Sequence, residues 1–221
     1  MKKIICTISF VFILMLNSNA QWVYFPDTTN RILIGDVSVS GNAITIEALI
    51  NMKSYNNPTQ EANDIVSKHT GVPDLSYLLR PNTFAIKTEN GFHSVSHTIP
   101  LCFDLTYHVA GSYDGDSIRY FINGEQVAST QWSGNLVQNS LITSIGNVAP
   151  IDITSNYKEQ FIGYIDELRI WNIGRTSNEL LNNMYELQNP VSQSGLVAYY
   201  KFNNGYENVQ GNALYNGVLN G

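Results

Sequence analysis

The sequence predicts an all-β protein, a sandwich of two antiparallel sheets with one short helix near residues 177–186. The dominant hydrophobic period is two, as in residues 44–50, where every even position is apolar. Dipeptides that tolerate positive φ separate such runs, at Asn90-Gly91, Asp114-Gly115 and Asn123-Gly124. Many short strands joined by tight turns are typical of a sandwich.

Short alternating or apolar runs mark the expected strands. In chain order we expect them at residues 31–34, 44–50, 64–67, 75–80, 83–87, 107–113, 117–122 and 141–145. The longest run, residues 161–171, is apolar on both faces, which predicts a central, buried strand. Residues 195–202 predict one more strand. This strand begins an Asn/Gly-rich tail, residues 195–221, which completes the domain.

The sequence also predicts where the single helix begins. Thr176 can cap the backbone while Glu179, three residues later, reaches back to complete a capping box. An apolar stripe then follows at Leu180, Leu181 and Met184, and Asn189-Pro190 ends the segment.

The N-terminus predicts export. Lys2 and Lys3 precede an apolar run from Ile4 to Leu16 and a small-residue site ending at Ala20, which is the pattern of a signal peptide. We expect cleavage after Ala20, a secreted or cell-surface product, and one domain over residues 21–221. No other stretch approaches the roughly 20 apolar residues that a membrane-spanning helix needs.

The charge of the chain argues against polyanionic partners. It carries 12 Lys and Arg against 18 Asp and Glu, a formal net charge of −6, and the predicted signal peptide removes two of the lysines. Nucleic acid and anionic membrane surfaces are therefore not expected partners.

Three stretches resemble the laminin-G-like, concanavalin A-like jelly-roll family, which includes pentraxins and many bacterial surface modules. The first is 44–48, followed by 65–68; the second is 107–115 running into 119–125; the third is 163–172 with Arg175-Thr176 and the short helix. Together they cover residues 22–187. The resemblance implies two antiparallel sheets packed face to face.

A catalytic site is not expected. Glycoside hydrolysis needs two carboxylates about 5–10 Å apart across one bond. The densest acidic pair in a strand is Asp166-Glu167, whose adjacent side chains would point to opposite faces. The hydrolase signature of the family, Glu-x-Asp-x-Glu, is absent from the sequence.

Asp166 is a candidate metal ligand. Its parity places a carboxylate among core-facing residues, where it needs a cation, an arginine or backbone N–H groups. Related folds often hold calcium near this edge, so the resemblance implies a Ca²⁺ site in which Asp166 is joined by Asp27, Asn147 and Asp152. The alternative is that Asp166 accepts backbone hydrogen bonds or pairs with Arg31, Arg119 or Arg175. Glu167, Arg169 and Trp171 share the opposite face, where we expect an ordinary exposed ion pair.

Aromatic residues in polar loops are candidates for stacking on sugar rings. Trp132 lies in a polar stretch without strand period, and Tyr55, Tyr77 and Tyr157 lie in or beside similar loops. The alternative for Trp132 is that it caps one end of the core.

The sequence therefore predicts a lectin-like binding or adhesion module for a glycan or an extracellular protein. The alternatives are a secreted glycoside hydrolase acting on O-glycosyl bonds of polysaccharides and a purely structural spacer, because a fold of this kind does not by itself name a function.

Overall fold

The computed structural model describes residues 21–221 except 27–29, 56–62, 71–73, 138 and 150–158. The predicted signal peptide, Asp27, Asp152 and Tyr157 lie outside the described residues. Among the described helices, none has the length and apolar character needed to cross a bilayer.

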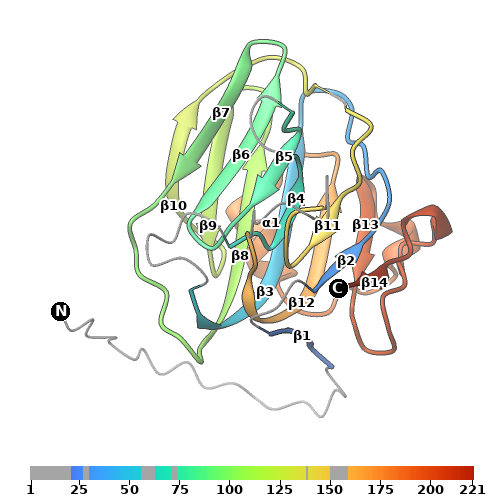
Figure 1. Cartoon of the computed structure of the whole chain (residues 1–221). Coiled ribbons are helices and arrows are strands. Elements are labelled where there is room, and N and C mark those ends of the chain that lie inside the picture. Colours follow the sequence, from blue (N-terminus) through green and yellow to red (C-terminus); the bar gives the residue numbers. More distant parts are fainter. Residues whose placement is uncertain (1–20, 27–29, 56–62, 71–73, 138, 150–158) are drawn as a thin grey trace.

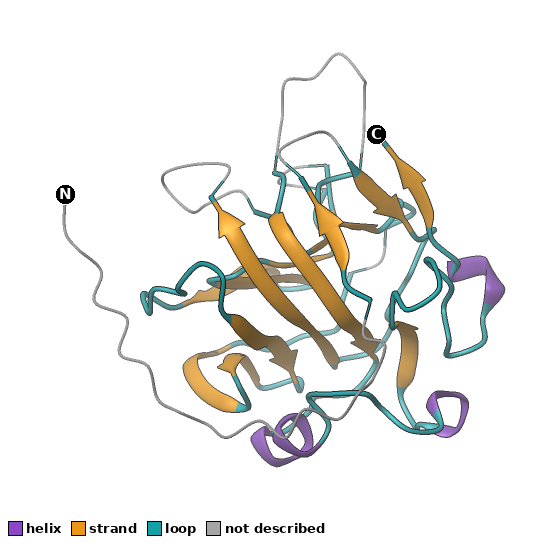
Figure 2. Cartoon of the chain, turned by 90° about the horizontal axis from the view of Figure 1, so that it is seen from below, coloured by secondary structure: helices purple, strands orange, loops and turns teal. Residues whose placement is uncertain are grey.

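Two antiparallel sheets stack face to face, as the sequence predicts (Figures 1 and 2). Sheet A has the order β1-β12-β3-β8-β9-β10, with β13 also paired to β12. Its strands are β1 (Val23–Phe25), β3 (Ile44–Ser54), β8 (Thr106–Tyr113), β9 (Ser117–Ile122), β10 (Glu125–Gln131), β12 (Ile162–Trp171) and β13 (Leu196–Tyr200).

Sheet B has the order β14-β2-β11-β4-β5-β6-β7. Its strands are β2 (Arg31–Leu33), β4 (Val66–Lys68), β5 (Tyr77–Leu79), β6 (Thr83–Thr88), β7 (Gly91–Ser96), β11 (Ser144–Ile145) and β14 (Val218–Asn220). The helical elements are α1 (Ser177–Asn182) and the 3₁₀ turns η1 (Pro190–Ser192) and η2 (Ala213–Tyr215).

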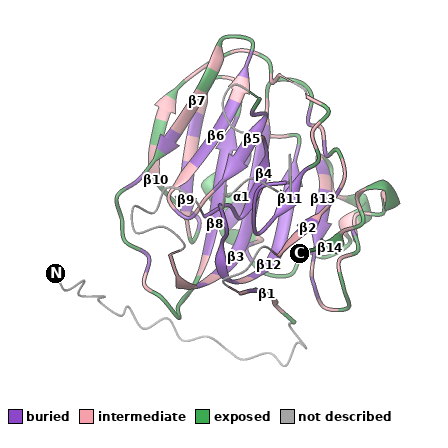
Figure 3. Cartoon of the chain, viewed as in Figure 1, coloured by how far each residue is buried: buried purple, intermediate pink, exposed green. Residues whose placement is uncertain are grey.

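The core lies between the sheets. The even positions of β3 from Ile44 to Ile50 enter it, which confirms the period-two prediction. They meet side chains of sheet B such as Leu79 and Phe84, and the central strands are buried along most of their length (Figure 3).

Part of the outer face of sheet A is also buried, because α1 and the chain after it cover it. Leu180 packs on Ala110 and Phe121 there. The predicted capping box is present: Thr176 accepts from the Glu179 amide, and the Glu179 carboxylate accepts from the Thr176 amide. The helix is shorter than predicted and ends at Asn182, and Leu181 is exposed.

A β-bulge in β12 corrects the predicted facing of Asp166. Asp166 pairs with Leu49 while Arg169 pairs with Glu47, so β12 has one residue more than β3 in this interval, and Glu167 has φ 50°. Ile165, Leu168 and Ile170 enter the core, whereas Asp166 lies on the outer face with Leu49. The simple parity of the sequence was therefore wrong across this bulge.

Candidate functional site

An open depression lies at one end of the sandwich beside Trp132. Its lining residues are Asn90, Asp116, Gln131, Trp132 and Ser133, and we call it the Trp132 depression. These residues come from the turn after β6, the turn between β8 and β9, and the end of β10. Three segments far apart in the sequence thus meet around one aromatic ring.

The Trp132 indole is held in a defined position. Its Nε1 donates to Thr88 Oγ1 at 3.0 Å, and its ring stacks on the His93 ring with centroids 4.2 Å apart and an interplanar angle of 4°. The Trp132 backbone N–H donates to the Asp116 carbonyl at 3.0 Å. The ring is partly buried against the core and also lines the depression, and its stacking on a sugar stays a prediction.

A glycine with positive φ lets two turns pack closely at the base of the depression. Gly134 has φ 107°, and a Cβ there would lie 3.0 Å from Asn90 Nδ2. Asn90 Nδ2 donates to the Ser133 carbonyl at 3.1 Å. A side chain at position 134 would separate these two turns.

The two predicted tyrosines that the structure describes, Tyr55 and Tyr77, do not join Trp132. Tyr77 is 3% exposed, and its hydroxyl donates to the Val37 carbonyl at 2.6 Å, so its ring offers no face for stacking. Tyr55 is partly buried, contacts Phe103 edge to face, and lines a separate small pocket with Pro81, Asn82, Ile99 and Leu101.

The two described members of the predicted calcium set lie on different parts of the sandwich. Asp166 is on the outer face of sheet A, where its Oδ1 accepts from the Glu167 amide at 2.9 Å, and burial, with the nearby Glu167 charge, raises the Asp166 pKa to about 7. Asn147 follows β11 of sheet B, and its amide is used within the protein: Oδ1 accepts from Val148 and Glu159 amides, and Nδ2 donates to Gln160. The fold therefore does not bring Asp166 and Asn147 together around one ion.

A buried charge cluster that the sequence did not predict is formed by Asp64, His69, Arg80 and Glu159. His69 Nε2 lies 2.9 Å from both Asp64 Oδ2 and Glu159 Oε2. Arg80 Nε donates to Asp64 Oδ1 at 2.7 Å, and Arg80 Nη2 lies 2.9 Å from Glu159 Oε2. The backbone brings the carboxylates together, since the Asp64 amide donates to the Glu159 carbonyl at 2.7 Å.

The pKa values of the cluster are explained by burial and pairing. Burial alone would lower the His69 pKa, but hydrogen bonds to the two carboxylates raise it to about 9. Burial would raise the Glu159 pKa, yet His69 and Arg80 lower it to about 2, whereas burial dominates for Asp64 and raises its pKa. The donor atoms of Asp64, His69 and Glu159 lie within 4.8 Å of one another, so this buried triad could hold a metal ion.

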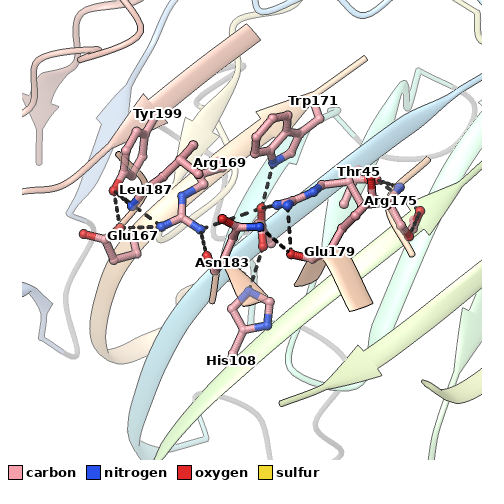
Figure 4. Close-up of polar contacts among 12 residues, drawn as sticks. Thr45, His108, Glu167, Arg169, Trp171, Arg175, Glu179, Asn183, Leu187 and Tyr199 are labelled. Atoms are coloured by element: carbon pink, nitrogen blue, oxygen red, sulfur yellow. Dashed lines mark hydrogen bonds and ion pairs between the residues drawn. The ribbon is translucent and has the colours of Figure 1, made fainter. Parts of the chain in front are cut away.

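A second buried network, centred on Glu47, lies on the outer face of sheet A. Figure 4 shows its members His108, Trp171 and Arg175. Glu47 Oε1 accepts from Trp171 Nε1 at 2.7 Å and from Arg175 Nη1 at 2.5 Å, and Glu47 Oε2 lies 2.8 Å from His108 Nε2. Burial alone would raise the Glu47 pKa, but His108 and the two nearby arginines lower it to about 2.

The same network corrects the prediction of an exposed ion pair at Glu167 and Arg169. Both are buried, Arg169 fully, beneath the segment after α1. Arg169 pairs with Glu167 and donates to the carbonyls of Asn183 and Tyr185, so it holds the covering segment onto the sheet (Figure 4).

Comparisons with known proteins agree with this architecture. A candidate carbohydrate-binding protein from Bacteroides ovatus aligns with a TM-score of 0.66 and 25% identity, covering 90% of this chain and 58% of that one. Domain 4 of an extracellular GH43 arabinanase from Geobacillus stearothermophilus, solved with arabinotriose, aligns with a TM-score of 0.50 and 16% identity, covering 73% of this chain and 75% of that one.

One curated relative is human pappalysin-1, 32% identical over 82 residues, which is 35% of this chain and 5% of pappalysin-1. The chain thus spans a small part of that relative and somewhat over half of the Bacteroides protein. A family model described as the concanavalin A-like lectin/glucanases superfamily, Laminin_G_3, matches residues 26–181. Because this match covers more than half of the chain and the two-sheet fold agrees with it, the protein belongs to the Laminin_G_3 family of the concanavalin A-like lectin/glucanase superfamily.

Proposed function

We propose that the protein is a secreted or cell-surface module that binds carbohydrate, with the Trp132 depression as the sugar-binding site. The observation that carries the proposal is a fixed, partly exposed indole surrounded by the side chains of Asn90, Asp116, Gln131 and Ser133.

The chemistry of the depression suits a sugar. The C–H faces of a pyranose or furanose ring pack against an aromatic ring, while its hydroxyl groups need amide and carboxylate partners at the rim. The depression supplies the ring from Trp132 and both partner types from Gln131 and Asp116. Stacking on His93 keeps the indole from turning, which lowers the entropic cost of binding.

Two comparisons support this direction. The Bacteroides ovatus protein aligns with most of the length of this chain and is itself a candidate carbohydrate-binding protein. The arabinanase domain belongs to an extracellular enzyme and was solved with a sugar, and its likeness to this chain concerns the fold. The signal-like segment at residues 1–20 supports export.

Calcium assistance belongs to the proposal as a prediction. It concerns Asp166, a buried carboxyl group on the outer face of sheet A, and not the Trp132 depression. A glycan array probed with the purified protein, first with calcium and then with chelator, tests binding and its calcium dependence together. Released sugar would contradict a binding-only module and favour the hydrolase alternative; retention without product supports the proposal.

A substitution series then tests the site. Trp132→Ala should weaken binding of the best array ligand about tenfold or more, since a stacking surface worth ~1.4 kcal/mol is lost. Because Trp132 also packs on the core, Gln131→Ala, at an exposed position, should weaken binding several-fold without affecting stability.

Tyr185→Ala is the matched control, since Tyr185 is an aromatic residue 59% exposed outside the depression. Isothermal titration calorimetry on all four proteins gives the affinities. Wild-type affinity in both site variants would contradict the assignment of the depression.

A further inference from the structure

In the Asp64–His69–Glu159 triad, one imidazole nitrogen faces one oxygen of each carboxylate. His69 Nε2 is 2.9 Å from Asp64 Oδ2 and also 2.9 Å from Glu159 Oε2. One N–H group cannot point at both oxygens with good geometry. Glu159 Oε2 is buried and lies 2.9 Å from both His69 Nε2 and Arg80 Nη2, but neither contact has the geometry of a hydrogen bond.

The distances are close to those of a metal site. Around a tetrahedral ion bound at roughly 2.0–2.2 Å, neighbouring nitrogen and oxygen ligands lie about 3.4 Å apart. The two distances from His69 Nε2 to the carboxylate oxygens, 2.9 Å each, would have to open by about half an ångström. All three ligand atoms lie within 4.8 Å of one another. One imidazole nitrogen and two carboxylate oxygens suit zinc-class ions better than calcium, which takes oxygen ligands.

Arg80 is placed where it can orient a ligand without occupying the ion position. Its Nε holds Asp64 Oδ1 at 2.7 Å, which turns Asp64 Oδ2 toward His69. Outer hydrogen bonds of this kind commonly fix the ligands of metal sites. The Arg80 charge also opposes a divalent ion, and this lowers the affinity.

From this geometry we infer that Asp64, His69 and Glu159 form a binding site for one divalent transition-metal ion of the zinc class. The ion would join the segment before β4 and the residue after β4 to the segment before β12. This site is separate from the Trp132 depression and does not depend on the proposed carbohydrate binding.

Titration of the purified protein with Zn²⁺, and with Co²⁺ as a spectroscopic probe, tests the inference. We expect one equivalent to bind per chain, measured by isothermal titration calorimetry. Calcium should bind this site far more weakly than zinc.

Variants separate a metal site from a structural ion cluster. His69→Gln and Glu159→Gln should lose Zn²⁺ binding, whereas His93→Gln, which changes a histidine stacked on Trp132, should keep it. Arg80→Gln retains all three ligands and removes the opposing charge, so it should bind Zn²⁺ more tightly than the wild type. A cluster with only a structural role would be destabilised by this change and gain no affinity.

If the ligand variants fail to fold, imidazole ¹⁵N NMR of the wild type provides the readout, with the His69 ring nitrogen as the one that shifts on Zn²⁺ addition. Absence of stoichiometric binding, or full binding by His69→Gln, would overturn the inference.

Discussion

Several charged residues of this protein are buried away from water. Asp166 is the clearest single case, because it is 3% exposed and its Oδ1 accepts a hydrogen bond from the neighbouring Glu167 amide. Burial raises its pKa to about 7, which means that the ionised form destabilises the folded protein.

This gives a pH-dependent prediction for Asp166→Asn. The folded-state pKa lies above the unfolded value of 3.8, so the cost of the carboxylate is absent below pH 3.8 and fully present above pH 7. The variant keeps the Oδ1 acceptor and should be more stable than wild type at pH 8, by up to about 4 kcal/mol, and equal to it near pH 3.5. Urea unfolding at both pH values measures the difference.

Asp104→Asn is the control, because its carboxylate is 71% exposed in a pair with Lys53 and should change stability little at either pH. Equal stability of Asp166→Asn and wild type at pH 8 would contradict the prediction. Both proteins are measured in chelator, and a stabilisation by added calcium that the variant loses would support the predicted calcium assistance at Asp166.

At the scale of single residues, the sequence predicted which residues are candidates better than it predicted what surrounds them. Parity along β12 placed Asp166 toward the core, but the bulge at Glu167 reverses the facing of the residues before it relative to the residues after it. Nothing in a single sequence marks that bulge. The alternative of a backbone hydrogen bond to Asp166 is present in the structure.

Among the elements, α1 and the chain after it depend on the Glu47 network for their position. Glu47 pairs with Arg175, which in turn donates to the Glu179 carbonyl, while Arg169 donates to the Asn183 carbonyl. The start of the helix was predictable from Thr176 and Glu179, because a capping box is local in sequence. The early end of the helix was not predictable from the sequence, because it depends on Arg169, which lies in a strand and not in the helix.

Glu47→Gln should therefore destabilise the protein by about 3–5 kcal/mol at pH 7, because it leaves Arg175 buried without its carboxylate. Hydrogen exchange should accelerate most in residues 177–187, which the network holds. Glu186→Gln is the control: its carboxylate is 49% exposed and pairs with Lys201, so its loss should cost less than ~1 kcal/mol. If both variants unfold at the same urea concentration, the Glu47 network does not hold α1 in place.

At the scale of the whole molecule, alternation and turn dipeptides were sufficient for the fold class. The strands at residues 44–50, 107–113 and 117–122 confirm this, as does the buried strand β12. The edge strands β1, β7, β10 and β14 were not predicted, because short or largely exposed strands have a weak hydrophobic pattern.

The candidate sites required tertiary structure. Trp132 could be selected from its polar surroundings, but its neighbours Asn90 and Asp116 come from other turns. Asp64 and Glu159 belong to segments that pair only in the folded sandwich, through the bridge between Asp64 and Gln160. The spacing of these residues in the sequence therefore does not predict the cluster.

The central claim is that carbohydrate binds at the Trp132 depression, and an NMR titration tests it most directly. A ¹H–¹⁵N spectrum recorded while the best array ligand is added should show the largest shifts at the Trp132 indole N–H and at the amides of Asn90, Gln131 and Ser133. Shifts confined to α1, to the Tyr55 pocket or to the Asp64 cluster would contradict the claim, because the ligand would then bind elsewhere on the sandwich.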